Sequence, residues 1–510
     1  MQRKTKHPCA LRPGPAQRGG AQTGDAQVPE SRVFARHPFS RVVLGLVSMA
    51  VPSLMTWGAT PGPLPPAADT ELARSMLREL VDINTTHDHG STAAAQVIQQ
   101  QLVAAGFPAD DVVLIAPADK PTKGSVVVRY RARAHGRKPA APVLFLGHLD
   151  VVEARREDWS MDPFQLTEED GWFYGRGVLD MKNGDAAMLE SLVRLKRERY
   201  VPGRDLIVAF TADEEAGGDA NGPAFLLKEH RDLIDAGLAI NLDGGGGNLK
   251  SGERQLFEVG TSEKVYVTFT LQTTSPGGHG SLPGPDNAIY RLADGLGRLE
   301  KFKFPVVTTA TTRASFEKLG ELESGALGQD MLAVAKSPPD PEAAERLSQI
   351  VRFNAQLRTT CVATLISGGH AENALPQRAK ATIQCRMMPG DTADNVQTTL
   401  TRVLDDPQIA VTLDAPPVVS PESPPTNEML DKAAKVVHSM WPGVPLIPTM
   451  ASGFSDDRQT RGAGIVSYDL SGVWIDGAEN RAHGRDERIG VREFDESVEY
   501  TYRLMKAFSR

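Results

Sequence analysis

Residues 143–150 read Val-Leu-Phe-Leu-Gly-His-Leu-Asp, an apolar run that ends in an imidazole and a carboxylate. A short, continuous apolar run predicts a β-strand that is buried on both faces. The runs at 206–210 and 238–242 have the same character, and apolar residues at helical spacing over 188–195 indicate a helix between the first two strands. This alternation predicts an α/β fold, with a mostly parallel sheet that is covered by helices on both faces.

The pattern changes after Gly260, where apolar and polar residues alternate over 265–271. Alternation with a period of two is typical of a strand with one face in water. The elements that follow are expected to be a helix at 289–299, strands at 361–366 and 379–387, a helix at 396–403 and a strand at 409–413. This β-α-β-β-α-β order predicts an inserted ferredoxin-like α+β domain. Residues 304–357 have no place in that order.

These patterns divide the chain into four segments. Residues 1–68 are expected to be a targeting and unstructured N-terminus, because a basic stretch, a short apolar run over 42–55 and a proline cluster are typical of a secretory signal. Residues 69–260 and 416–510 are expected to form two parts of a catalytic domain, with 261–415 as a lid or dimerisation domain. The apolar run is shorter than the roughly 20 residues of a spanning helix. We therefore expect an exported, periplasmic or secreted protein, with an uncleaved anchor or an overlong start as alternatives.

Charge and cysteine content narrow the class of protein further. The net charge of -8 argues against nucleic acid as a partner, since an acidic body repels phosphate backbones. Cys9 lies in the segment that we expect to be removed, and neither Cys361 nor Cys385 has a second ligand at metal-binding spacing. These two lie on neighbouring predicted strands, so a cross-strand disulfide could form in an oxidising compartment. Buried free thiols are the expected state.

Acidic residues and an imidazole follow the ends of the buried strands. The three strands lead into His148 and Asp150, into Glu214 and Glu215, and into Asp243. Ligands of open α/β sheets bind beyond the carboxyl ends of the strands, so these side chains are expected to converge. Imidazole and carboxylate ligands without cysteine are typical of zinc, or a related divalent ion, in an open catalytic site. Each motif alone is more often a turn or a solvated loop, and the signal lies in their combination.

The chain carries five such motifs, at residues 147–152, 159–164, 175–182, 213–218 and 482–488. Their combination resembles metallopeptidase family 20, which includes carboxypeptidase S, carnosinase-type dipeptidases, aminoacylase and succinyl-diaminopimelate desuccinylase. The resemblance covers the chain from about Asp69 to its C-terminus. It implies a zinc-exopeptidase-like catalytic domain with a ferredoxin-like lid, and a homodimer that forms through that lid.

The resemblance also implies a site with two zinc ions, for which cobalt or manganese could substitute. It assigns His148, Asp180 and Asp243 to one ion. The other ion is assigned to Asp180, Glu215 and His483, so Asp180 would bridge the two. The motifs at 175–182 and 482–488 supply the ligands that the strand ends do not.

The remaining roles also follow from the resemblance. Glu214 would be the general base for a water between the metal ions, and Asp150 would orient His148 through its second nitrogen. His279 would stabilise the oxyanion of the tetrahedral intermediate. The substrate-binding residues would be Asn373, Arg386 and Gly453. An ion pair of Arg386 with Asp391 is the alternative for that arginine.

We expect a di-zinc metallo-exopeptidase that cleaves dipeptides or C-terminal residues. An N-acyl-amino-acid amidohydrolase is the alternative, so the expected partner is a small peptide or N-acyl amino acid. Asp243 favours peptides, because desuccinylases usually have glutamate there. Asn183 and Phe454 depart from the family pattern and leave the specificity open. A silent binding or dimerisation protein, and a two-metal phosphoesterase without a visible phosphate clamp, are more distant alternatives.

Overall fold

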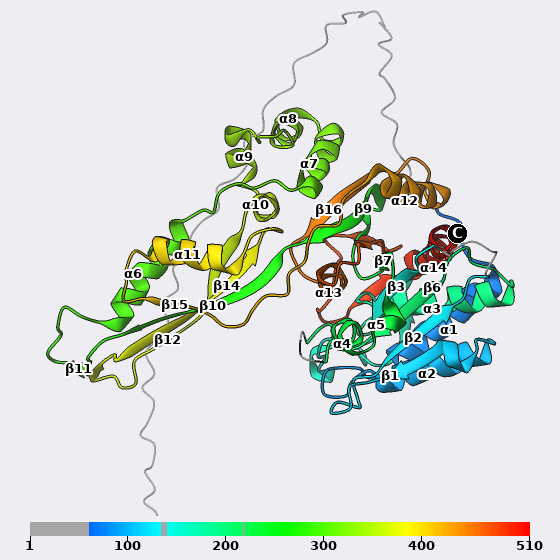
Figure 1. Ribbon diagram of the computed structural model, residues 1–510, viewed down its shortest axis with the longest axis horizontal. Helices are drawn as coiled ribbons and strands as arrows, with labels where there is room; N and C mark the ends of the chain where they lie inside the picture. Colours follow the sequence, from blue (N-terminus) through cyan, green and yellow to red (C-terminus); the bar gives the residue numbers. More distant parts are fainter. Residues whose placement is uncertain (1–60, 134–139, 217, 219) are drawn as a thin grey trace, which may run out of the picture. The chain divides into compact units, whose positions relative to one another are not determined.

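The structure is a computed structural model, and it describes residues 61–133, 140–216, 218 and 220–510. Its largest sheet has ten strands, of which nine follow the order β1 (Val112–Ile115), β2 (Ser125–Tyr130), β6 (Leu206–Thr211), β3 (Val143–His148), β7 (Leu238–Asn241), β17 (Ser467–Asp469), β9 (Glu253–Glu263), β8 (Gly246–Lys250) and β18 (Trp474–Asp476). The tenth, β16 (Leu446–Ala451), pairs with β9 in parallel. The central strands β6, β3, β7 and β17 are parallel neighbours, as predicted (Figure 1).

Helices cover both faces of this sheet because its strands alternate between two cores. Val143 and Phe145 of β3 face one core, whereas Leu144 and Leu146 face the other. The first core includes residues of α1 (Ala67–Val81), α2 (Thr92–Ala104), α3 (Lys182–Arg197), α12 (Asn427–Met440) and α14 (Val491–Phe508). The second includes residues of α4 (Gly222–Glu229) and α5 (Arg231–Ile234). The predicted layer structure is confirmed.

A buried lysine fixes the start of α3 against the end of α1. Lys182 is fully buried, and its Nζ donates to the main-chain carbonyls of Leu80 at 2.8 Å and Ile83 at 2.9 Å. These carbonyls belong to the C-terminal end of α1, where backbone acceptors lack helical partners. Because Asp180 stands just before α3, this contact also positions one of the predicted metal ligands.

A second sheet has four antiparallel strands in the order β12 (Thr360–Gly368), β14 (Arg378–Met387), β10 (Val265–Thr274) and β15 (Ala410–Leu413). Two helices, α6 (Ala288–Lys301) and α11 (Ala393–Leu404), share its core and lie together on one face (Figure 1). We call these six elements the four-stranded unit. Their order along the chain agrees with the predicted ferredoxin-like pattern.

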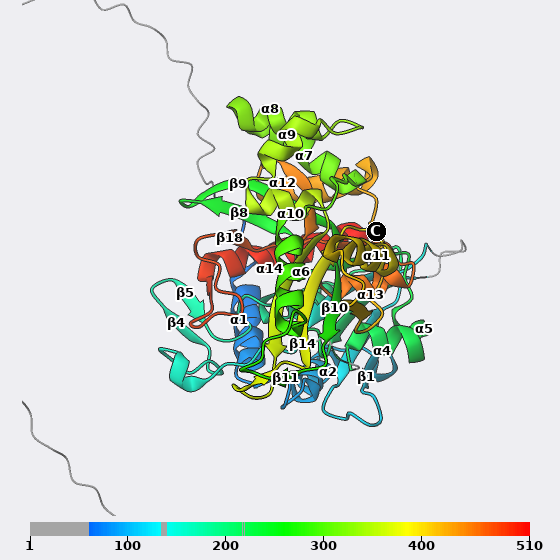
Figure 2. The same ribbon diagram turned by 90° about the vertical axis from the view of Figure 1, so that its left-hand side faces the viewer.

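The segment that had no predicted place forms four short helices with a small core of its own. They are α7 (Ala310–Leu322), α8 (Gly325–Val334), α9 (Pro341–Leu347) and α10 (Val351–Leu357). The helices α7, α8 and α9 gather in one cluster at the top of Figures 1 and 2. Glu422 accepts from the amides of Ala310 and Thr311, at 3.3 and 2.5 Å, and so caps the start of α7.

Cys361 and Cys385 form a disulfide, so the expectation of free thiols is wrong. The two residues are direct partners in the register of β12 and β14, and their Cα atoms are 4.1 Å apart. Residues that stand directly opposite on antiparallel strands bring their Cβ atoms close together. The sequence predicted both strands but not the register that makes these cysteines neighbours.

The described residues belong to one compact unit that extends to Arg510, so the domain boundaries at 260/261 and 415/416 stay predictions. The predicted signal, with its apolar run over 42–55, lies outside the described residues. None of the described helices is both long and apolar enough to cross a membrane.

Candidate metal centre

Loops at the ends of three neighbouring strands meet two segments from other parts of the chain. His148 ends β3, Glu215 lies in the loop after β6, and Asp243 follows β7. Asp180 precedes α3, and His483 precedes β19 (Arg488–Gly490). We call these five residues the metal group. The sequence placed all five at this edge of the sheet, and the structure brings them together.

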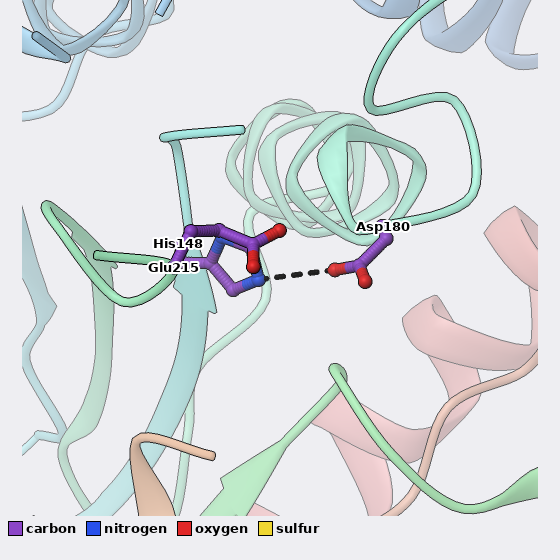
Figure 3. A group of neighbouring side chains, drawn as sticks. All are labelled: His148, Asp180 and Glu215. Atoms are coloured by element: carbon purple, nitrogen blue, oxygen red, sulfur yellow. Dashed lines mark ion pairs between the residues drawn. The ribbon is translucent and has the colours of Figure 1, made fainter. Parts of the chain in front are cut away.

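Asp180 lies between the two imidazoles of the metal group. Its Oδ1 is 3.2 Å from His148 Nε2, and its Oδ2 is 3.1 Å from His483 Nε2. Asp243 Oδ1 is 3.6 Å from His148 Nε2, while Glu215 Oε1 is 3.0 Å from His483 Nε2. Ligand atoms of His148, Asp180 and Glu215 all lie within 4.8 Å of one another (Figure 3). One carboxylate with an oxygen toward each imidazole is the arrangement that a metal-bridging ligand needs.

The electrostatics of the metal group favour a bound cation. Burial lowers the pKa of His148, but hydrogen bonds with Asp180 and Asp243 outweigh it and raise that pKa well above its usual value. Hydrogen bonds with Asp180 and Glu215 raise the pKa of His483 to about 10. Burial opposes ionisation of Asp180, yet its hydrogen bonds with the two imidazoles hold its pKa below the usual range. Three carboxylates thus share two imidazoles, and a divalent cation would neutralise the excess charge.

Asp150 contacts the second ring nitrogen of His148, but through its main-chain carbonyl and not through its carboxylate. His148 Nδ1 donates to the main-chain carbonyl of Asp150 at 3.0 Å, whereas the carboxylate of Asp150 is 3.8 Å away. That carboxylate is occupied, because its two oxygens accept from the amides of Glu214 and Glu215, each at 3.0 Å. The bond at Nδ1 leaves Nε2 of His148 as the ligand atom that faces Asp180 and Asp243. Asp150 therefore shapes the loop that carries Glu214 and Glu215.

Glu214 has the surroundings of a group held ready for proton transfer. It is buried, and its Oε1 has no hydrogen-bond partner among the described residues. Burial raises the pKa of its carboxyl well above the usual value, although the charge of His148 opposes this. Its neighbour Glu215 points toward His483 instead. Two adjacent carboxylates thus differ in their partners, as the sequence pattern predicted.

A buried ion pair that we did not predict holds the segments of Asp180 and His483 together. Glu487 is fully buried, and its Oε1 accepts from the amides of Gly177, Leu179 and Asp180 at 3.1, 2.8 and 3.1 Å. Its Oε2 accepts from Arg176 Nη1 at 2.5 Å. Arg176 and Glu487 belong to the motifs at 175–182 and 482–488. The spacing of these motifs along the chain gave no indication that the two residues pair.

Asp456 is a second residue that the sequence did not single out. It is buried, and its carboxylate accepts from Thr211 Oγ1 at 2.8 Å and from Asn221 Nδ2 at 2.6 Å. These contacts tie the loop of Gly453 to the end of β6, close to the metal group. Burial raises the pKa of Asp456 to about 6.

Four residues were predicted to serve the substrate, namely His279, Asn373, Arg386 and Gly453. His279 is exposed in β11 (Gly278–His279), which pairs with β13 (Ala374–Leu375), and its Nδ1 is 2.7 Å from Ser281 Oγ. Asn373 lies beside it, because its carbonyl accepts from Gly280. In the described part of the chain, no hydrogen bond or ion pair joins these residues, Arg386 or Gly453 to the metal group. Their roles stay predictions.

Arg386 does not form the alternative ion pair with Asp391. Its guanidinium lies over the rings of Tyr266 and Phe454, with centroid distances of 4.9 and 5.5 Å. Asp391 instead accepts from Thr359 Oγ1 at 3.1 Å. The guanidinium therefore remains without an anionic partner among the described residues.

Comparison with known proteins agrees with this geometry. The model of peptidase family M20/M25/M40 matches residues 144–507. The chain belongs to this family. The match includes every residue of the metal group, and it confirms the resemblance inferred from the motifs. Like other members of the family, the protein is a hydrolase that acts on C–N bonds.

Curated relatives and a solved structure support the assignment. The chain is 28% identical over 377 residues to a probable carboxypeptidase S-like 2 of Dictyostelium discoideum, which covers 72% of this chain and 71% of that protein. It is 28% identical over 380 residues to the N-fatty-acyl-amino acid synthase/hydrolase PM20D1 of Xenopus tropicalis, with 72% of each chain covered. The M20 family metallo-carboxypeptidase Sso-CP2 of Sulfolobus solfataricus has the same fold, with a TM-score of 0.62, 16% identity and coverage of 86% and 99%.

Proposed function

We propose that the protein is a di-zinc exopeptidase that removes a C-terminal residue from a small peptide. The observation that carries this proposal is the position of Asp180, with one carboxylate oxygen directed at each of the two imidazoles. His148, Asp180 and Asp243 would hold one ion, and Asp180, Glu215 and His483 the other. Nitrogen and oxygen ligands without cysteine suit zinc in a catalytic site, and cobalt or manganese could replace it.

When bound, the two ions would polarise the scissile carbonyl and lower the pKa of the attacking water. Glu214 would accept the proton of that water, since its carboxylate is buried beside Glu215 and has an oxygen without a partner. It would then pass the proton to the leaving amine. Asp150 holds this carboxylate in place through the amide of Glu214.

The substrate side of the proposal rests on Arg386 of the four-stranded unit and on His279 of β11. Arg386 has a guanidinium without an anionic partner and could form a bidentate pair with the α-carboxylate of a substrate. His279 is exposed, so a closing movement or a second copy of the chain could bring it to the reacting carbonyl. An N-acyl-amino acid has the same carboxylate beside its amide. The activity named for the PM20D1 relative of Xenopus tropicalis favours such a substrate as the second candidate.

Metal content and turnover test the proposal together. We expect about two zinc ions per chain, loss of dipeptide cleavage on chelation, and recovery with zinc or cobalt. Glu214→Gln should keep both ions but lose most of its turnover, and Glu157→Gln is the matched control on an exposed glutamate. A protein that cleaves a phosphate ester but no peptide or N-acyl amino acid would disprove the proposal. So would a Glu214→Gln variant with a near-normal rate.

We also propose that the protein forms a homodimer through the four-stranded unit. The edge strand β12 exposes Val362, Leu365 and Ile366 by 56%, 68% and 66%. An exposed apolar edge strand is a surface on which another chain can pair. Leu365→Lys should then convert a dimer into a monomer in light scattering, whereas Val351→Lys, at a position that is 85% exposed, should not.

Export is a further proposal, and the disulfide supports it. Cys361 and Cys385 are bonded, and disulfides persist mainly in oxidising compartments. The protein should therefore be found in a periplasmic or secreted fraction. N-terminal sequencing that recovers Met1 from a cytosolic fraction would contradict this proposal.

A further inference from the structure

A cavity of about 550 Å³ lies next to the loop that carries Asp456. One wall contains Gly218, three residues after Glu215, and another contains Phe454 and Arg458. Asp456 stands between those two residues, and its charge acts on the carboxyl of Glu214. The cavity therefore adjoins the loops of the metal group, and its volume suits a small ligand or one end of a substrate.

Two guanidiniums meet at one aromatic ring of this cavity. The guanidinium carbon of Arg458 is 4.0 Å from the ring centroid of Phe454, and that of Arg386 is 5.5 Å from the same centroid. Phe454 also contacts Tyr266, at a centroid distance of 6.2 Å. Phe454 stands where the family pattern has a small residue. The departure thus creates a ring on which both cations pack.

In the part of the chain that the structure describes, neither guanidinium forms an ion pair with a carboxylate. Arg386 Nη1 and Arg458 Nε are buried, and no hydrogen bond satisfies them within the described ranges. Burial, together with the charge of Arg458, lowers the pKa of Arg386. Buried cationic donors are costly unless an anion accepts from them. Arg458 lines the cavity, and Arg386 lies over the rings of Tyr266 and Phe454, which also line it, so an anion bound at these rings would meet both cations.

Glu263 lines the same cavity and its charge acts on Arg386, but no ion pair joins the two among the described residues. Glu263 is held by Arg461 Nη1 at 3.2 Å, by Ser420 Oγ at 2.7 Å and by the amide of Ser455 at 2.8 Å. Asp414 is exposed and accepts from Thr270 Oγ1. Burial lowers the pKa of Lys264 to about 7, so the permanent positive charges are the two guanidiniums.

On the basis of the proposed function, we infer that this cavity receives a second carboxylate of the substrate. Arg386 would bind the α-carboxylate, and Arg458 would bind the side-chain carboxylate of the same residue. The preferred substrates would then be peptides or N-acyl amino acids that end in aspartate or glutamate. Valines, prolines and the Phe454 ring would pack against the methylene groups of that side chain.

The test compares two dipeptides that differ only in this carboxylate, Ala-Glu and Ala-Gln. The wild-type enzyme should prefer Ala-Glu by about tenfold in kcat/KM, on the scale of a hydrogen bond to a charged group. Arg458→Met keeps an apolar side chain on Phe454 but removes the charge, so the preference should fall to about twofold or less. Arg458→Lys should keep part of the preference. Arg402→Met is the matched control, because Arg402 lies over the ring of Phe302 outside the cavity, and it should change nothing.

Two results would overturn the inference. One is an enzyme that cleaves both dipeptides equally well, and the other is an unchanged preference in Arg458→Met. If no dipeptide is cleaved, the proposed function fails, and calorimetry with glutarate and butyrate decides the inference by itself. Tighter binding of glutarate that is lost in Arg458→Met would support the cavity as a dicarboxylate site. Equal binding of glutarate by both proteins would disprove it.

Discussion

Reduction of the disulfide between Cys361 and Cys385 should destabilise the four-stranded unit. The size of this effect depends on the number of residues between the two cysteines. The two cysteines are 24 residues apart in sequence. A cross-link that closes a loop of this size removes chain entropy from the unfolded state, which corresponds to about 3 kcal/mol in the free energy of unfolding. For a domain of about 150 residues, the length of the predicted segment 261–415, such a loss lowers Tm by roughly 6 to 12 °C.

Thermal unfolding with and without a phosphine reductant measures this effect. A phosphine is preferable to a dithiol, because dithiols also bind zinc and would disturb the metal group. The Cys361→Ala/Cys385→Ala variant is the control, and the reductant should leave its Tm unchanged. Peptide mapping without reduction should recover the two cysteines in one linked fragment. Unlinked peptides, or a wild-type Tm that does not respond to a reductant shown to release the thiols, would refute the reasoning.

Three other predictions concern residues outside the catalytic proposal. Glu487→Gln should weaken zinc binding by about 10- to 100-fold in a chelator competition, because it loosens the amides that hold Asp180. Glu190 is buried without hydrogen-bond partners, and burial raises its pKa to about 8. Since the folded state then favours the protonated carboxyl, wild-type stability should fall as the pH rises from about 4.3, the usual value, to 8. Glu190→Gln should therefore be more stable than wild type by about 2 kcal/mol at pH 9 and lose that advantage at pH 4, as urea unfolding would show. Phe269→Ala should cost about 3 to 5 kcal/mol in urea unfolding, since the ring is fully buried in the four-stranded unit.

The sequence predicted those parts of the fold in which local pattern and burial agree. The apolar runs that became β3 and β6 are fully buried strands. Threonine is a favoured N-cap residue, and the side chain of Thr426 accepts from the amide of Met429 at the start of α12. In these segments the pattern of apolar and polar residues directly reflects which side chains are buried.

Features that depend on pairing between distant residues could not be predicted in this way. The register of β12 against β14 decides the disulfide, and no local pattern encodes it. The amides of Glu214 and Glu215 donate to the Asp150 carboxylate only because the loop after β6 follows a particular path. The helices α7 to α10 were missed because their core is small and their turns are short. The strand-end motifs did predict that His148, Glu215 and Asp243 lie close together, since parallel strands end at a common edge, whereas Asp180 and His483 came only from the family resemblance.

The contact of Glu263 with Ser420 also bears on how this protein could be engineered. Glu263 ends β9, and Ser420 lies 157 positions later, yet their side chains share a hydrogen bond of 2.7 Å. A segment whose two ends meet at one point can be excised and replaced by a short linker without moving the strands on either side. β9 would keep its parallel neighbour β16 after such a deletion. We expect a shortened scaffold of this kind to retain the metal group, so that metal loading could be studied in the absence of the four-stranded unit.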